Sequence, residues 1–293
     1  MFKRSVGIIG ATSFVGEYLL DRLAKSNVEI TAFSRKHREI GTDCRTLNIS
    51  WRILGNSADP SCTQDAAQTI ENWISLGPVW ALPELFPMLE AYGVRRIVAL
   101  SSTSRFTKTA SRNTSEQALA GHLINGEESL KAWAEKQGVE WVIIQPTMIY
   151  GYGKDRNIAR IARFIERFGF FPLLGKATGR RQPVHVEDVV DACCSALFSV
   201  RSLNRSYIVS GKEQLTYRTM VERIFLSMGK SPVLLSLPLS VFQYAILFLR
   251  ILPRFKSLNA EMVSRMNQDM VFDHEAAAQD LGFKPRAFLD SKD

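Results

Sequence analysis

The stretch Val6-Gly7-Ile8-Ile9-Gly10-Ala11-Thr12-Ser13-Phe14-Val15-Gly16 decides the fold. It predicts a buried parallel strand over 6–9, a tight turn of small residues and a following helix. Such a turn directs backbone N–H groups and a helix N-terminus at a phosphate. We therefore expect residues 10–16 to bind the pyrophosphate of a dinucleotide, although Ser13 stands where the fingerprint has its middle glycine. The alternative is an ordinary tight turn between a strand and a helix.

Short apolar runs and amphipathic segments alternate through the first half of the chain. Expected strands cover 29–33, 51–54, 72–76, 94–101 and 141–145, and expected helices cover 17–23, 59–71, 83–92 and 115–137. This alternation predicts an α/β fold, namely a Rossmann-type, doubly wound parallel sheet with right-handed crossovers.

The rhythm changes after Gly151. Expected helices there cover 157–168, 186–200 and 216–228, and one expected strand covers 206–209. We therefore expect a Rossmann core over 1–152 and a small C-terminal α/β cap, or substrate region, over 153–293. Residues 182–210 are expected to return partly to the core.

The composition is that of an ordinary soluble globular protein, with 46% hydrophobic and 23% charged residues among 293. The net charge of +8 favours anionic partners, such as nucleotide-type ligands or an anionic membrane surface. No basic patch is interleaved with aromatic residues, so we expect no nucleic-acid partner. We expect a cytoplasmic protein, because Lys3-Arg4 and the short apolar run after it fit a strand better than a secretory signal. The sequence is compatible with a homo-oligomer.

The four cysteines are Cys44, Cys62, Cys193 and Cys194. None belongs to a Cys-x-x-Cys pair, and neighbouring residues in a helix point in different directions. We therefore expect reduced thiols, with neither a metal site nor a disulfide framework.

The segment 237–252 is strongly apolar, but it is too short, and too interrupted by Gln243 and Arg250, for a transmembrane helix. A buried cap helix is the simpler interpretation. The alternative is an interfacial helix over 237–256 that contacts a membrane or a protein partner. In that case the protein would lie at the inner face of a membrane.

The end of the second expected strand predicts which nicotinamide cofactor binds. Its sequence is Ser34-Arg35-Lys36-His37-Arg38, with no acid before Glu39. An acid there would hydrogen-bond the ribose hydroxyls of NAD, whereas a guanidinium can grip the 2′-phosphate of NADP. We therefore predict NADP(H) in preference to NAD(H), with Ser34 and Arg35 as contacts. A solvated basic loop is the alternative.

These features together resemble the short-chain dehydrogenases/reductases. The resemblance is carried by Gly10-xx-Ser13-xx-Gly16, Ser34-Arg35, Gly55-Asn56 and Ser101-Ser102, and by the stretches 145–151, 183–189, 271–273 and 281–286. The later stretches are similar to those of the extended and atypical branch. That branch holds the NAD-dependent epimerase/dehydratase proteins and the relatives of the complex I subunit that binds NADPH. It implies an oxidoreductase or an epimerase/dehydratase-type enzyme acting on a nucleotide sugar or another small, anionic molecule.

The sequence departs from this family at its catalytic pair. The family uses Tyr-xxx-Lys, and the segment 126–133 resembles the one that follows the lysine. Counting back from Glu127 places Leu123 at the lysine position and Leu119 at the tyrosine position; a shift of one residue gives Ile124 and Ala120. The chain is therefore expected to work without this pair. The alternative is a catalytically silent NADP(H)-binding scaffold or sensor, associated with a membrane or a partner through 237–256.

Further site residues are expected where the strands end. Besides residues 10–16, Ser34 and Arg35, the expected cofactor contacts are Asn56, Ser75, Leu76, Ser101, Pro146 and Met148. Ser102 and His122 are the candidate catalytic residues, since one could contact a substrate oxygen and the other could donate a proton. The expected substrate contacts are Thr103, Tyr150, Arg180 and Arg181.

Four arginines recur at spacings of four, three and four: Arg156, Arg160, Arg163 and Arg167. The first directly precedes the expected helix 157–168, and the other three lie in it. This spacing places them on one helix face. A solvated helix face is the simpler interpretation, and contact with an anionic substrate is the other.

Overall fold

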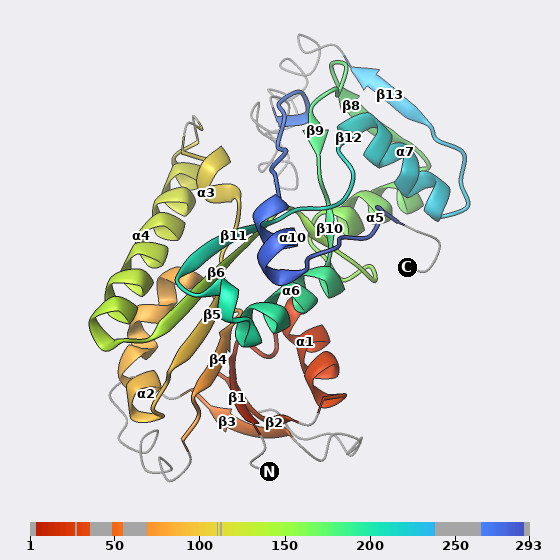
Figure 1. The fold of residues 1–293 in the computed structure, drawn as a ribbon. Helices are drawn as coiled ribbons and strands as arrows, with labels where there is room; N and C mark the ends of the chain where they lie inside the picture. The colour runs from red at the N-terminus through yellow and green to blue at the C-terminus, as the bar shows by residue number, and fades with distance from the viewer. Residues whose placement is uncertain are drawn as a thin grey trace.

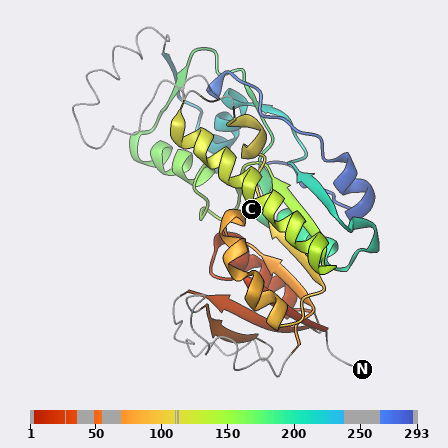
Figure 2. The ribbon, with the colours of Figure 1, turned by 90° about the vertical axis from the view of Figure 1, so that its left-hand side faces the viewer.

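The computed structural model describes residues 4–26, 28–35, 49–54, 69–109, 111, 113–237 and 265–289. Figures 1 and 2 show a sheet with helices on both faces, and a smaller group of helices and strands at one end of it.

Seven parallel strands form the central sheet, in the order β11-β6-β5-β4-β1-β2-β3. Their bounds are β1 Arg4–Ile9, β2 Val28–Ser34, β3 Ile49–Ile53, β4 Asn72–Ser75, β5 Arg96–Leu100, β6 Glu140–Pro146 and β11 Arg205–Val209. The strand order reverses between β1 and β4, as in a doubly wound sheet. The prediction of a Rossmann-type fold is confirmed.

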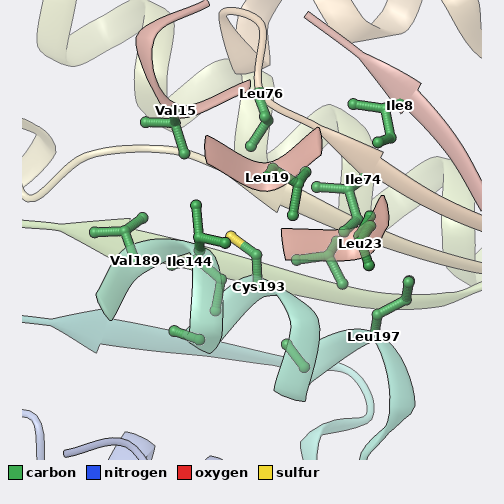
Figure 3. Packing of buried hydrophobic residues seen from close by; sticks show 14 of the residues in the cluster. Ile8, Val15, Leu19, Leu23, Ile74, Leu76, Ile144, Val189, Cys193 and Leu197 are labelled. Atoms are coloured by element: carbon green, nitrogen blue, oxygen red, sulfur yellow. The ribbon is translucent and has the colours of Figure 1, made fainter. Parts of the chain in front are cut away.

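One face of the sheet is covered by α1 (Phe14–Ala24) and α6 (Val186–Phe198), which pack against each other. Leu19 and Leu23 of α1 meet Cys193 of α6 in the apolar cluster that Figure 3 shows. α10 (Glu275–Leu281) lies against α6 and β11 (Figure 1). Residues 186–209 and 275–281 therefore belong to the sheet's own layers, although they lie far along the chain.

The opposite face is covered by α4 (Thr114–Gln137), α2 (Phe86–Ala91) and the 3₁₀-helix η2 (Val79–Leu85). The helix expected over 83–92 is confirmed for α2, but it is wrong for residues 83–85, which belong to η2. Pro83 lies inside η2, and because proline has no N–H it cannot make the bond that would continue an α-helix through it. The end of the expected helix 59–71 is also wrong, because residues 69–71 are not helical; residues 59–68 lie outside the described residues.

The smaller group has its own apolar cluster, formed by residues between Tyr150 and Phe288. Its helices are α5 (Ile158–Phe168) and α7 (Tyr217–Ser227), and its strand pairs are β7–β10, β8–β13 and β9–β12. These strands are β7 Ile149–Tyr150, β8 Phe171–Leu174, β9 Arg180–Arg181, β10 Val184–His185, β12 Leu215–Thr216 and β13 Leu234–Leu237. We call this group the cap.

No helix in the described part of the chain is both long and apolar enough to cross a bilayer. Of the segment predicted to contact a membrane or a partner, 237–256, only Leu237 lies within the described residues.

Candidate functional site

The carboxyl ends of β1, β2 and β4 meet at one edge of the sheet, and the strand register fixes which residues become neighbours there. Ile9 is paired with Phe33 of β2 and with Ser75 of β4. The next residue of each strand, Gly10, Ser34 and Leu76, follows at the same level. The N–H of Leu76 donates to the carbonyl of Ile9 at 2.8 Å. Four predicted cofactor residues, Gly10, Ser34, Ser75 and Leu76, therefore lie at one edge.

Two glycines shape the turn between β1 and α1. Gly10 has φ +77°, a left-handed conformation that favours glycine. A Cβ at Gly16 would lie 2.5 Å from the carbonyl oxygen of Ala11, so no side chain fits where α1 meets the turn. The turn and the helix are thus held in contact, with Thr12 exposed at the tip.

Ser13, in the middle-glycine position of the fingerprint, caps α1. Its Oγ accepts a hydrogen bond from the N–H of Gly16 at 3.1 Å. Within the described residues, the N–H groups of Phe14 and Val15 in the first helical turn make no hydrogen bond. These two donors, at the positive end of the helix dipole, fit the phosphate that the fingerprint predicts.

Ser34 and Arg35 end β2 beside this turn. Ser34 is buried, and its carbonyl accepts a hydrogen bond from the N–H of Leu54 at 2.8 Å. Arg35 is exposed. The two residues lie next to Gly10 at the end of β2, which β1 separates from β4. In this fold a dinucleotide ribose would lie at this position. Asn56 lies outside the described residues.

The hydroxyl groups after β5 all take part in hydrogen bonds within the protein. Thr103 Oγ1 donates to the carbonyl of Pro146 at 3.1 Å, and Ser102 Oγ accepts from the N–H of Ser104 at 3.1 Å. Ser101 Oγ donates to Glu127 Oε1 at 2.5 Å. Within the described residues the hydroxyl proton of Ser102 has no acceptor, whereas those of Ser101 and Thr103 are already donated.

Glu127 is a site residue that the sequence analysis did not single out. Its side chain has no exposed surface, and its carboxylate also accepts from Gln145 Nε2 at 2.9 Å and pairs with Arg105. The network connects α4 with the ends of β5 and β6. A glutamate directly after a glycine, in the segment compared with the family's catalytic helix, is the sequence feature that could have drawn attention to it.

α4 carries no proton relay at the two expected positions. Leu123 is buried in the apolar cluster under α4, and Leu119 packs against that cluster. His122 is exposed, with its ring 5.7 Å from the ring of Trp80. The structure therefore places His122 on the outer side of α4, away from Leu119 and Leu123 in the cluster.

The two arginines predicted to bind substrate are engaged within the protein. Arg180 Nη2 lies 2.7 Å from Asp269 Oδ2 in an ion pair that is about half exposed. Arg181 is buried, and its guanidinium donates to the carbonyls of Arg180, Gln268 and Arg265. Burial lowers the pKa of Arg181 from its ordinary value.

Tyr150 and Met148 lie in the cap's apolar cluster. Tyr150 is buried, and its hydroxyl donates to the carbonyl of Ala287 at 3.3 Å and accepts from the N–H of Leu289 at 3.2 Å. Met148 packs against the cluster and is half-buried. Both positions are consistent with packing, and a substrate contact for Tyr150 stays a prediction.

A second basic group lies between α3 (Ser104–Thr107) and the C-terminal segment. Arg265 Nη1 is 2.6 Å from Glu116 Oε1. Lys108 follows α3, and burial, with a contribution from Arg265, lowers the pKa of its ammonium group from its ordinary value. Sequence reasoning missed both residues, because neither belongs to a motif.

A shallow cavity of about 340 Å³ lies elsewhere, between the segments 212–214 and 271–274, beside the buried Gln182. None of the predicted cofactor residues lines it. Within the described residues there is no group of histidine, cysteine and carboxylate side chains that could hold a metal ion. Cys193 and Cys194 are free thiols, and Cys44 and Cys62 lie outside the described residues.

Residues 81–209 match the model of the NAD dependent epimerase/dehydratase family. Over these residues the chain is similar to this family. The match begins in η2 and ends with β11, so it includes Glu127, the serines after β5 and the 183–189 stretch. The predicted resemblance, including that to a complex I subunit, is confirmed.

Two curated relatives illustrate the range of this family. The chain is 24% identical over 159 residues to UDP-glucose 4-epimerase of Vibrio cholerae, covering 54% of this chain and 46% of the relative. It is 22% identical over 254 residues to NADH dehydrogenase [ubiquinone] 1 alpha subcomplex subunit 9 of Arabidopsis thaliana, covering 80% of this chain and 60% of the relative. The matches thus span about half the length of these relatives.

A solved structure shares the fold. UDP-glucuronic acid 4-epimerase from Bacillus cereus, in complex with NAD, superposes with a TM-score of 0.70 at 14% identity, covering 97% of this chain and 94% of that one. At this identity the likeness shows the fold alone, and the superposition covers both the sheet and the cap.

Proposed function

We propose that this protein binds NADP(H) at the carboxyl edge of its central sheet. It lacks the Tyr-xxx-Lys pair and does not carry out the proton transfer that this pair performs. The observation that carries the proposal is the pair Leu119 and Leu123 in the apolar cluster under α4. A leucine has no proton to transfer and no charge with which to hold a ribose. The turn at Gly10, by contrast, keeps the features that suit a pyrophosphate.

The preference for NADP(H) is supported by the exposed Arg35 beside the turn. A guanidinium there would pair with the 2′-phosphate, whereas NAD offers it only hydroxyl groups. The solved epimerase with NAD shows that the fold also accommodates the cofactor without this phosphate. The preference therefore depends on the residues at the end of β2.

Titration of the protein with NADPH and NADH, followed by nicotinamide fluorescence, tests both parts. We expect tighter binding of NADPH, and a loss of about tenfold or more for Arg35→Glu, since a charge-assisted bond is exchanged for repulsion. Arg95→Glu is the matched control, because Arg95 is an exposed arginine before β5, at the other end of the strands. Equal binding of the two cofactors would contradict the preference, and no binding of either would contradict the proposal.

Turnover separates a silent binder from an enzyme. The protein with bound NADP⁺ should form no NADPH when UDP-glucose or UDP-glucuronic acid, whose alcohol groups could donate hydride to the cofactor, is added. Leu119→Tyr/Leu123→Lys restores the family's pair in the same helix and is the informative comparison. Reduction of NADP⁺, or epimerisation of the sugar, by the unmodified protein would show that it is an enzyme and would contradict a silent binder.

A second candidate is an enzyme that acts on a nucleotide sugar or another small anionic molecule with a different proton donor. Two observations favour it. The basic side chains of Lys108 and Arg265 lie beside each other after α3, and the hydroxyl proton of Ser102 has no acceptor among the described residues. If this candidate is right, Lys108→Met should raise the KM for the sugar nucleotide and Ser102→Ala should lower kcat. Lys136→Met, at the exposed end of α4, is the control.

A further inference from the structure

The outer face of α5 combines arginines with exposed aromatic surface. Ile158, Ile161 and Ile165 are buried against the cap's cluster, so the opposite side of the helix faces solvent. We define the α5 surface as the exposed arginines of this helix with the neighbouring apolar side chains: Arg160, Arg163, Arg167, Phe168, Phe170 and Val233. Figure 1 shows α5 in the cap, beyond the carboxyl edge of the sheet.

The arginines of this surface lack acidic partners. Within the described residues, no carboxylate oxygen lies within 4.0 Å of Arg160, Arg163 or Arg167, whereas Arg180, Arg205 and Arg223 elsewhere all form ion pairs. Glu166 is the one acidic residue of α5. It follows Arg163 by three residues and so lies beside it on the helix surface, but the two side chains form no ion pair. The three guanidinium groups therefore present a net positive charge along one stripe.

Apolar side chains border the stripe at the C-terminal end of α5. Phe168 is 52% exposed and Val233 is 47% exposed. The rings of Phe168 and Phe170 lie 6.3 Å apart, and the N–H of Phe171 donates to the carbonyl of Val233 at 2.9 Å, so these residues form one patch. The guanidinium of Arg167 lies 5.4 Å from the ring centre of Phe168. Cation and aromatic ring are thus side by side on the surface.

We infer that the α5 surface docks on a bilayer that contains anionic phospholipid. Arginine binds phosphate oxygens through two N–H donors at once, and each basic residue near such a surface contributes about 1 kcal/mol. Exposed phenylalanine beside the cations is suited to the boundary between headgroups and acyl chains. A nucleic acid would satisfy the arginines, but it would leave the apolar border of Phe168 and Val233 without a partner. The inference goes beyond cofactor binding and does not depend on it.

Flotation of the full chain with phosphatidylcholine vesicles, with and without phosphatidylglycerol, tests the inference. We expect binding only when phosphatidylglycerol is present, and a decrease at high salt. The triple variant Arg160→Gln/Arg163→Gln/Arg167→Gln should bind about 100-fold more weakly, from three cations at roughly 1 kcal/mol each. Phe168→Ser should lower binding on the order of tenfold, since it removes apolar area but no charge.

The control is Arg4→Gln/Arg95→Gln/Arg201→Gln, which removes the same charge from exposed arginines at the amino ends of β1 and β5 and within η3 (Val200–Ser202). It should bind like the unmodified protein, and thermal melting checks that each variant is folded. Equal losses in the two triple variants would overturn the inference, because binding would then follow net charge alone. Absence of vesicle binding, or displacement from vesicles by duplex DNA, would overturn it as well.

Discussion

Glu127 of α4 and Arg105 of α3 form an ion pair behind the carboxyl ends of β5 and β6, where the Glu127 side chain has no exposed surface. Ser101 Oγ and Gln145 Nε2 complete the hydrogen bonds to this carboxylate. Because a buried charge is costly unless it is paired, the pair fixes the segment that carries Ser102 relative to α4. The segment after β5 is therefore held in place by a network of side chains. None of these side chains stands at the positions of the family's tyrosine and lysine.

Arg105→Met should destabilise the protein by about 3 kcal/mol, because it leaves the buried Glu127 carboxylate without its cation. Denaturant unfolding at neutral pH measures the change. Glu127→Gln in addition should recover much of the loss, since the charge that needed a partner is then absent. If the losses of the single variants simply add in the double variant, the two side chains are not coupled as the structure places them.

The sequence predicts the sheet well because its determinants are local. The stretch 6–16 contains its own strand, turn and helix start, and each is stabilised by contacts within a few residues. Strand periodicity also identifies β5 and β6 without knowledge of their neighbours. The same reasoning fails at 83–92, where Pro83 forces a 3₁₀-helix before α2 can begin.

The site is harder to predict because its partners are distant in sequence. Ser101 and Gln145 lie 26 and 18 residues from Glu127, and only the packing of α4 on the sheet brings them together. Arg181 was expected to meet a substrate, yet its donors are taken by carbonyls of the 265–268 segment, more than 80 residues away. Motif spacing identifies the residue types but not which groups they will contact.

Two glycines of α4 should respond in opposite directions to alanine. A Cβ at Gly126 would lie 2.6 Å from the backbone nitrogen of Trp80, whereas one at Gly121 would meet nothing within 4 Å. Gly121→Ala should stabilise the protein by about 0.5–1 kcal/mol through helix propensity. Gly126→Ala should destabilise it, because α4 must move away from η2. Urea unfolding compares the two, and similar shifts for both would contradict the close contact between α4 and η2.

Ser13→Ala should cost about 1 kcal/mol, because it removes the acceptor that caps α1 at the Gly16 N–H. Ser13→Gly, which restores the glycine of the fingerprint, should cost only a few tenths of that amount. Thermal melting measures the difference. NADPH titration of the glycine variant then tests whether the Ser13 side chain limits the approach of the pyrophosphate. If the side chain limits it, the glycine variant should bind NADPH more tightly than the unmodified protein.

His185 should make the stability of the protein depend on pH. It is buried, and burial, with a contribution from Arg286, lowers the pKa of its imidazole from 6.5 to about 4. Above pH 6.5 the ring is neutral in both the folded and the unfolded chain. Between these values the unfolded chain binds a proton that the folded chain does not, so the free energy of unfolding falls as the pH falls, by at most about 1.4 kcal/mol per pH unit.

His185→Asn isolates this effect, because asparagine does not titrate and can still accept the hydrogen bond that His185 Nδ1 receives from the N–H of Glu187 at 3.3 Å, at the start of α6. Urea unfolding should be measured for both proteins from neutral pH down to about pH 4.5. The unmodified protein should lose more stability than the variant over this range, and the difference should keep growing down to its lower end, because the pKa of His185 in the folded protein, about 4, lies below it. Parallel profiles would mean that His185 is protonated as easily in the folded protein as in the unfolded chain.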